Sequence, residues 1–258
     1  MIAAYALAVV LAANGFSAFG GSGRRGGGAS VTVRPATVAW YGDSRTQGAC
    51  SSVGPPAVLD SLLPSGYSVQ NNGVSGETAH EIYARVAAGA AAACVGETCG
   101  HYIVQGGVNT LKSPAFNGQA AGDVASVALN GGGACDTGTP NSCGTLDSVE
   151  LLHANHPRAR VFVIGEMPYG GCDVLTCPSL EAPGPRAGAY NAALLSACAA
   201  RPWLTCIFPY DDFEDQDTPD DLLPAYRCAD GIHLLDAGSA ALAAMVYSSA
   251  AWPFGAQQ

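Results

Sequence analysis

The sequence predicts an α/β domain in which a five-stranded parallel sheet carries helices on both faces. Two observations lead to this fold class. Short apolar runs of strand length alternate along the chain with longer segments of helical composition, a pattern typical of parallel sheets covered on both sides. Hydrophobic residues make up 48% of the 258 residues and charged residues only 12%, so the chain can bury a substantial core.

Three strands and two helices are predicted in the first part of the domain. Residues 37–41 form a short apolar run, which predicts the first strand. Residues 56–63 suit a short helix that the following proline stops, and residues 67–70 suit a second strand. Residues 78–93 are rich in alanine, which favours a helix, and residues 102–105 predict a third strand.

Two strands and three helices are predicted in the second part. Residues 146–155 suit a helix, which a proline two residues later stops, and residues 160–164 predict the fourth strand. Residues 186–200 suit the next helix and residues 204–208 the fifth strand. A closing helix is predicted at residues 236–249.

Residues 111–144 separate these two parts. They are rich in glycine and irregular, with one short helix predicted near residues 123–129. A bond between Cys135 and Cys143 would pin this stretch. We therefore interpret it as an inserted surface excursion.

The N-terminal residues differ in composition from the rest of the chain. Residues 2–13 are uncharged and almost wholly apolar, which is the length of a signal-peptide core and too short for a membrane span. No Lys or Arg precedes them, and a short buried helix is the alternative. We predict a signal peptide at residues 1–20, a glycine-rich linker at 21–35 and a single folded domain at 36–258.

The ten cysteines also indicate export. Their number is even and none forms the Cys-x-x-Cys pair of zinc ribbons and thioredoxins. Eight lie in close couples, and Cys50 and Cys228 remain. Connectivity does not follow from sequence alone, but this pairing is the most economical, and it predicts secretion into an oxidising space. The close couples are Cys94 with Cys99, Cys135 with Cys143, Cys172 with Cys177, and Cys198 with Cys206.

The charge balance excludes several kinds of partner. The chain has 11 basic and 21 acidic residues, a net charge of -10. No basic stripe is present to neutralise phosphates, so we expect no nucleic-acid partner, and an anionic membrane surface would repel the chain. No apolar run reaches the roughly 18 residues of a membrane span, so stable membrane insertion is not expected. We also predict no metal, no cofactor and a monomeric protein.

Four short blocks follow predicted strands or precede the last helix. Ligands bind at the carboxyl ends of strands in parallel α/β sheets, so these blocks carry the most weight. The blocks are Gly42-Asp43-Ser44-Arg45-Thr46, Asn71-Asn72-Gly73-Val74-Ser75-Gly76, Gly106-Gly107-Val108-Asn109 and Asp230-Gly231-Ile232-His233. In this order they resemble the SGNH (GDSL-type) esterase and lipase superfamily over roughly residues 37–250. The resemblance implies a flavodoxin-like three-layer α/β/α sandwich.

The resemblance also implies a role for each marker residue. Ser44 would be the nucleophile, at the start of a helical turn, and His233 would take its proton and return it to the leaving group. Asp230 would orient the imidazole. The backbone N–H groups of Ser44 and Gly73 and the side chain of Asn109 would form the oxyanion hole.

The expected reaction is hydrolysis of a carboxylic ester through an acyl-serine intermediate. The pattern Gly-Asp-Ser-x-Thr-x-Gly at residues 42–48 resembles carbohydrate-esterase branches, which implies short acyl (acetyl) groups on a small-molecule or polymer-borne sugar. A lipid-directed lipase, lysophospholipase or thioesterase is the alternative. An inactive secreted binding protein on the same fold is a more remote one. Thr110 departs from the family pattern, in which a second acid follows the asparagine.

Further polar residues receive roles on the same basis. Arg45 and Glu77 flank the predicted oxyanion loops and are candidates to line the substrate pocket. Tyr169 is a third candidate, with a packing role as the alternative, and family analogy makes Asp43 structural. In this fold, a bond between Cys50 and Cys228 would tie the nucleophile loop to the Asp-His loop. Surface or capping roles are predicted for His80, His101, His153 and His156.

Seven carboxylates lie between residues 211 and 221. Their spacing is too irregular for an EF-hand loop. A solvated loop is the simplest interpretation, with a weak Ca²⁺ site or a rim that repels anionic substrates as the open alternatives.

Overall fold

The computed structural model describes residues 36–89, 99–116, 118–169 and 183–249, and every structural statement below concerns these residues. The chain divides into units of residues 1–33 and 34–258, and all described residues belong to the second. The predicted signal peptide and the predicted linker both lie outside the described part. No helix within it is long and apolar enough to cross a bilayer.

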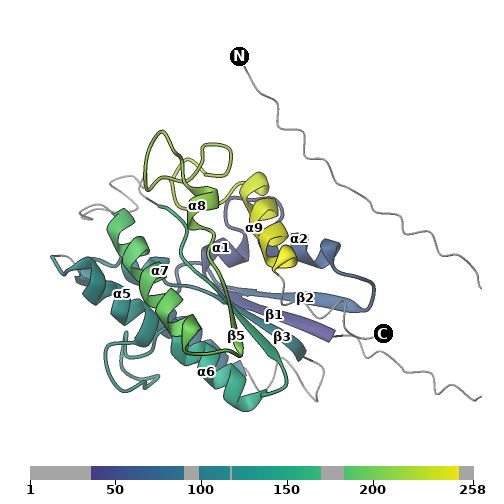
Figure 1. Cartoon of the computed structure of the whole chain (residues 1–258), viewed down its shortest axis with the longest axis horizontal. Coiled ribbons are helices and arrows are strands. Elements are labelled where there is room, and N and C mark those ends of the chain that lie inside the picture. Colours follow the sequence, from purple (N-terminus) through teal and green to yellow (C-terminus); the bar gives the residue numbers. More distant parts are fainter. Residues whose placement is uncertain (1–35, 90–98, 117, 170–182, 250–258) are drawn as a thin grey trace, which may run out of the picture. The chain divides into compact units, whose positions relative to one another are not determined.

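Five parallel strands form one sheet in the order β2-β1-β3-β4-β5 (Figure 1). This order belongs to doubly wound flavodoxin-like sheets, so the predicted fold class is confirmed. Ligands of such sheets bind near the point where the order reverses, here between β1 and β3. The strands are β1 (Ala36–Gly42), β2 (Tyr67–Gly73), β3 (Cys99–Gln105), β4 (Arg160–Ile164) and β5 (Leu204–Ile207).

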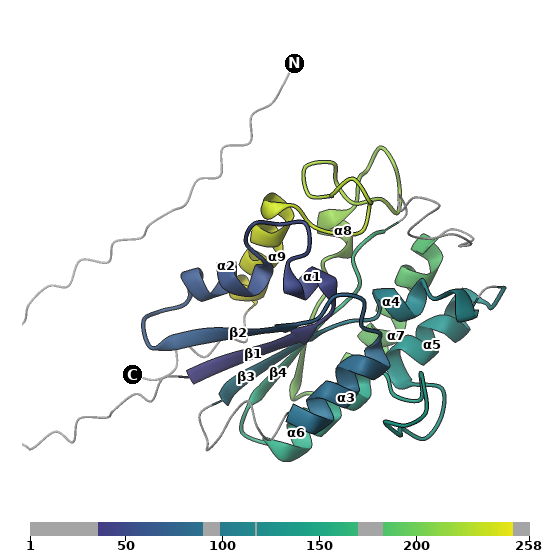
Figure 2. The same ribbon diagram turned by 180° about the vertical axis from the view of Figure 1, so that it is seen from behind.

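Strand side chains point alternately to either side of the sheet, so both faces carry apolar residues to bury. Helices cover both faces (Figure 2). From β1, Ala39 and Tyr41 enter one core, whereas Val38 and Trp40 enter the other. The first core receives α3 (Ala79–Gly89), α5 (Ala121–Asn130), α6 (Thr145–Asn155) and α7 (Pro183–Ala199). The second receives α2 (Pro55–Leu62) and α9 (Asp236–Ser248).

The strand β2 extends three residues beyond its predicted end. Asn71, Asn72 and Gly73 pair with β1 in a register that sets Gly73 opposite Gly42. Ladder hydrogen bonds use only the backbone, so polar side chains do not end a strand. The block of residues 71–76 is therefore held beside the block of residues 42–46.

The segment 111–144 is more than a surface excursion, which corrects that prediction. Its helix α5, expected near residues 123–129, buries Val124, Ala125, Ala128 and Leu129 in the first core. A 3₁₀ turn, η1 (Pro114–Phe116), precedes it. The segment therefore completes the layer beside α7.

Three helices of four residues complete the fold: α1 (Ser44–Gln47), α4 (Val108–Leu111) and α8 (Tyr210–Phe213). The helical turn at Ser44 was implied by the family resemblance, whereas α4 and α8 were not predicted. A single turn is too short to show a hydrophobic period. Each follows the carboxyl end of a strand, at the edge where ligands bind.

Three of the five predicted disulfides are present in the described part of the chain. They are Cys50–Cys228, Cys135–Cys143 and Cys198–Cys206. The other two predicted pairs depend on residues that the structure does not describe, because Cys94, Cys172 and Cys177 lie outside the described ranges. The bond from Cys94 to Cys99 and the bond from Cys172 to Cys177 therefore stay predictions.

Two histidines expected at the surface are buried. His101 lies in β3 and is 5% exposed, and His80 in α3 is 8% exposed. Burial, with a contribution from Arg160, lowers the pKa of His101 to about 4, so this side chain is neutral at pH 7. His156 does cap the C-terminus of α6, as predicted, and His153 stacks on Trp203 with ring centroids 3.9 Å apart.

Candidate active site

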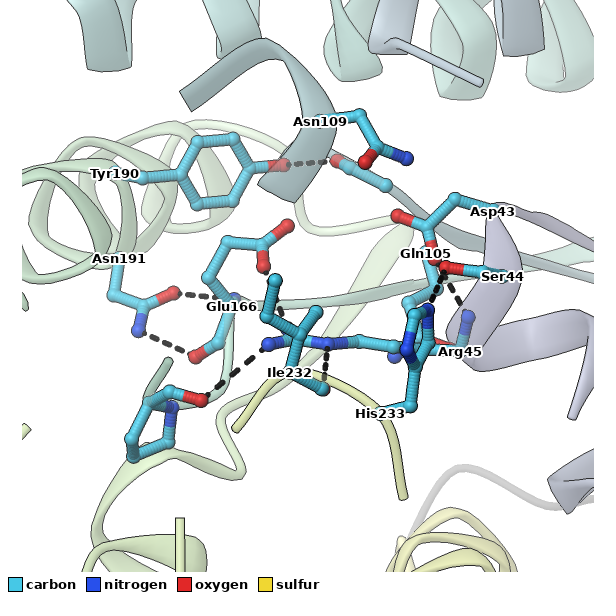
Figure 3. A network of polar contacts seen from close by, with 12 residues as sticks. Asp43, Ser44, Arg45, Gln105, Asn109, Glu166, Tyr190, Asn191, Ile232 and His233 are labelled. Atoms are coloured by element: carbon cyan, nitrogen blue, oxygen red, sulfur yellow. Dashed lines mark hydrogen bonds and ion pairs between the residues drawn. The ribbon is translucent and has the colours of Figure 1, made fainter. Parts of the chain in front are cut away.

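Ser44, His233 and Asp230 form a continuous hydrogen-bonded chain at the carboxyl edge of the sheet. Ser44 Oγ lies 2.8 Å from His233 Nε2, and His233 Nδ1 lies 2.5 Å from Asp230 Oδ2. Figure 3 shows the His233 ring directed at Ser44. In this arrangement the imidazole can take the proton of the hydroxyl, and the carboxylate can stabilise the resulting imidazolium.

The position of Ser44 follows from the caps of α1. Asp43 is the N-cap, and its Oδ1 accepts the N–H of Arg45 at 2.9 Å. Gly48 ends the helix in the left-handed region, at φ 89°. Ser44 is therefore the first residue of a turn that is closed at both ends.

The loop of Asp230 and His233 is held by its own backbone. Asp230 Oδ1 accepts the N–H groups of Ile232 and His233 at 2.9 and 3.0 Å, and Cys228 N–H donates to His233 O at 2.8 Å. Partial burial opposes ionisation of Asp230, but the N–H groups and the imidazole lower its pKa overall. The carboxylate that faces His233 therefore stays ionised.

The pKa of Asp43 shifts in the opposite direction to that of Asp230. It is 1% exposed, and burial raises its pKa, with the charge and the N–H of Arg45 acting against the rise. Its contact with Arg45 N–H is a helix cap. Both facts favour Asp230 over Asp43 as the partner of His233.

A disulfide and a carboxylate tie the neighbouring loops together. Cys50, six residues after Ser44, is bonded to Cys228, two residues before Asp230. At the start of α9, Asp236 accepts hydrogen bonds from the N–H and hydroxyl of Ser52 at 2.6 and 2.7 Å. The segment after the proposed nucleophile is thus held against the segment of the proposed base.

The predicted oxyanion-hole residues come from the ends of neighbouring strands. Gly73, at the end of β2, approaches α1 so closely that a Cβ would lie 2.2 Å from Gln47 N, so only glycine fits. Its N–H donates to Asn71 Oδ1 at 2.9 Å, a contact that a bound oxyanion would have to replace.

Asn109 lies in α4, after β3, and is held from two sides. Its Nδ2 donates to Glu77 O at 2.8 Å, and an amide carries a second N–H for another acceptor. The next residue, Thr110, accepts the N–H of Ala79 through Oγ1 at 3.0 Å. Thr110 therefore fastens the Asn109 turn to the start of α3, although it is not the usual acid.

Arg45 and Tyr169 are buried and do not line a surface pocket, which corrects that candidate role, and Tyr169 has the packing role that was its alternative. Arg45 is 2% exposed and Tyr169 is fully buried. The Arg45 side chain runs inward from α1, where its Nη1 meets Glu166 Oε2 at 3.0 Å, and its guanidinium carbon lies 5.8 Å from the Tyr169 ring centroid. A buried carboxylate and an aromatic ring solvate the cation inside the protein.

Glu77 is engaged with Arg85, and its predicted contact with substrate stays a prediction. Both Glu77 oxygens accept from Arg85 Nε at 2.7 Å. The same guanidinium donates to Asn72 O at 2.8 Å and to Gly42 O at 3.1 Å. The pair therefore ties the ends of β1 and β2 together.

Sequence reasoning missed Glu166. It follows β4 by two residues and is 3% exposed, and its carboxylate bonds to Arg45 and lies against Gly107, where a Cβ would be 2.7 Å from Oε1. Asn191 in α7 holds its backbone through two hydrogen bonds, at 2.8 and 2.9 Å (Figure 3). No motif marks this acid, but its place just past the carboxyl end of a strand was an available signal.

Glu166→Gln is expected to remove a pH-dependent loss of stability. Burial raises the pKa of Glu166 from 4.5 to about 7, although Arg45 opposes the rise. The folded state therefore binds more protons than the unfolded state between these values, and stability falls as pH rises from about 4.5 to 7. The full effect would be about 3 kcal/mol.

Denaturant unfolding between pH 4.5 and 8 measures this effect. The free energy of unfolding of the wild type should fall with pH more steeply than that of the variant. Parallel curves would contradict the raised pKa of Glu166.

Several carboxylates of residues 211–221 have partners inside the protein. Asp221 pairs with Arg227 at 2.9 Å, the Tyr210 hydroxyl donates to Asp220 Oδ1 at 2.5 Å, and Asp220 N–H donates to Glu214 Oε1 at 2.9 Å. In the part of the chain that the structure describes, no three His, Cys, Asp or Glu side chains are grouped to hold a metal ion. The segment is thus organised largely by its own contacts.

Known structures of similar fold come from several bacteria. A lipase/acylhydrolase from Enterococcus faecalis is 19% identical, with a TM-score of 0.54 over 82% of this chain and 93% of that chain. A GDSL-like lipase from Bacteroides thetaiotaomicron is 18% identical, with a TM-score of 0.55 over 82% and 85%. A member of the lipolytic protein G-D-S-L family from Veillonella parvula is 15% identical, with a TM-score of 0.57 over 82% and 96%. At such identities these matches show a shared fold.

The family itself follows from the sequence match. No curated protein matches the chain. The model of the GDSL-like lipase/acylhydrolase family matches residues 40–241, more than half of the chain, and this span contains all four blocks. The chain therefore belongs to the GDSL-like lipase/acylhydrolase family and is a carboxylic ester hydrolase.

Proposed function

We propose that this protein is a secreted serine esterase that removes short acyl groups, acetyl above all, from carbohydrate. One observation carries the catalytic part of the proposal. Ser44 Oγ lies 2.8 Å from His233 Nε2, while the other ring nitrogen lies 2.5 Å from the Asp230 carboxylate.

The proposed mechanism has two steps. His233 takes the Ser44 proton while Oγ attacks the ester carbonyl, and the protonated ring then gives that proton to the departing alcohol. Water hydrolyses the acyl-serine by the same route in reverse. The N–H groups of Ser44 and Gly73 and the Asn109 amide would stabilise the oxyanion in both steps.

Two observations support the carbohydrate substrate and the secretion. The Gly-Asp-Ser-x-Thr-x-Gly pattern of residues 42–48 resembles carbohydrate-esterase branches of the superfamily. The disulfides Cys50–Cys228, Cys135–Cys143 and Cys198–Cys206 suit an oxidising compartment.

A lipid ester is the second candidate substrate. Val74 directly follows Gly73, Leu235 lies two residues after His233, and their side chains are 39% and 38% exposed. Exposed apolar side chains on the loops of the proposed oxyanion hole and base would suit an acyl chain.

Hydrolysis of p-nitrophenyl esters from acetate to palmitate tests the acyl preference. We expect kcat/KM for acetate to exceed that for palmitate at least tenfold, and acetic acid to be released from acetylated xylan. A long-chain optimum would reject the acetyl preference in favour of the lipid substrate. Hydrolysis of p-nitrophenyl acetate without release from xylan would reject the carbohydrate part alone.

A further inference from the structure

One buried ion pair begins beside Ser44 and reaches the chain next to two other proposed catalytic residues. Arg45 directly follows Ser44, and its Nε donates to the carbonyl of Ile232, the residue before His233, at 3.0 Å. Its Nη1 lies 3.0 Å from Glu166, whose Oε1 is so close to Gly107, two residues before Asn109, that a Cβ there would lie 2.7 Å from it. Arg45 thus connects the block of Ser44 to the block of His233 (Figure 3), and Glu166 lies against the block of Asn109.

The pair is anchored on its remaining sides as well. Arg45 Nη2 donates to Pro168 O at 3.3 Å, beyond the end of β4. Asn191 binds both the N–H and the carbonyl of Glu166, which fixes the backbone of that residue to α7. The guanidinium is a rigid planar fork, so acceptors at three places leave it one orientation.

Stability alone does not explain this arrangement. The side chains of Arg45 and Glu166 are 1% and 3% exposed, so both charges have left water. Replacing a buried ion pair with well-packed apolar side chains is often neutral or stabilising, because desolvation offsets the attraction. A role in positioning the neighbouring loops accounts for the pair where a contribution to folding stability does not.

The disulfide Cys50–Cys228 holds the same loop less closely. Cys228 lies five residues before His233, whereas the Arg45 contact is made to the residue directly before it. The disulfide therefore limits how far the loop can move, and the guanidinium holds the backbone directly before the imidazole.

We propose that Arg45 and Glu166 are positioning residues that hold the nucleophile, the base and the Asn109 turn in one register. The proposal rests on the proposed function of Ser44, His233 and Asn109. Misplacing a reacting group by about 1 Å can cost about 100-fold in rate without loss of substrate binding. The pair should therefore govern kcat rather than KM.

The double variant Arg45→Met/Glu166→Leu tests this proposal. It removes both charges together and leaves neither buried alone. At pH 8, with p-nitrophenyl acetate, we expect kcat to fall about 100-fold, KM to change less than threefold and Tm to stay within about 5 °C. Inactivation by a phosphonate reagent that labels the active serine should slow in parallel. The matched control is Arg201→Met/Glu150→Leu, an ion pair between α6 and the segment just after α7, which should retain wild-type kcat.

The variant Arg45→Lys separates charge from geometry. Lysine keeps the charge but, as a point charge, cannot reach Glu166, Ile232 O and Pro168 O together. We expect an intermediate, roughly tenfold loss of kcat.

Each outcome decides between the possibilities. Wild-type kcat in the double variant would overturn the positional role, and so would loss of its fold, since the pair would then be structural. Full activity of Arg45→Lys would overturn the geometric part and leave charge as the cause. An inactive wild type would instead reject the proposed function, because the positional role is tested only against an active parent.

Discussion

Replacing Ser44 with alanine is expected to lower kcat for p-nitrophenyl acetate by about a millionfold, with the fold unchanged. The Ser44 hydroxyl lies 2.8 Å from His233 Nε2, so the imidazole can take its proton as it attacks. Loss of the nucleophile removes the acyl-enzyme route and leaves only what binding and the oxyanion hole contribute, a residual of roughly 10³ to 10⁴ over water. The side chain is 3% exposed, so the substitution deletes one buried oxygen and adds no bulk.

Ser51→Ala is the matched control for this variant. Ser51 lies in the loop that follows α1, where its Oγ donates to Gly48 O at 2.9 Å, outside the proposed triad. Its kcat should stay within about twofold of the wild type. Labelling by a phosphonate reagent should add mass to the wild type and to Ser51→Ala and not to Ser44→Ala. Comparable turnover by Ser44→Ala and the wild type would show that Ser44 is not the nucleophile.

Asp230→Asn is expected to lower kcat about ten-thousandfold. The carboxylate accepts from His233 Nδ1 and so selects the tautomer whose Nε2 can take the Ser44 proton. The amide would keep much of the geometry but would present an N–H to the ring and favour the wrong tautomer. KM should change little, because the group does not touch the ester.

Asp43→Asn provides the comparison, because asparagine caps a helix about as well as aspartate. The Asp43 side chain caps α1 through the N–H of Arg45, so this variant should keep activity within about tenfold. Steady-state kinetics of both variants at pH 8 decide the assignment. A large loss in Asp43→Asn with a small one in Asp230→Asn would exchange the two roles.

Much of this protein could be read from its sequence. Five strand runs, the helices between them and the four polar blocks were visible because apolar periodicity and strand ends are local properties. The flavodoxin-like order confirmed by the structure brings those blocks to one edge, and the pairing of Gly42 with Gly73 aligns the first two. The pairing of Cys50 with Cys228 was also predicted and is present.

The tertiary structure alone decided where the buried charges lie. Arg45 was predicted to face substrate, because an arginine beside a nucleophile is indistinguishable in sequence from one that turns inward. Its partner Glu166 is 121 residues away, and desolvation is offset only where such distant groups meet. The same holds for the buried Tyr169 and for α4, whose single turn has no period to read. Local composition indicated the elements, and the resemblance of the four blocks to a known family indicated the catalytic candidates, whereas contacts between distant residues determined which polar side chains are buried and paired.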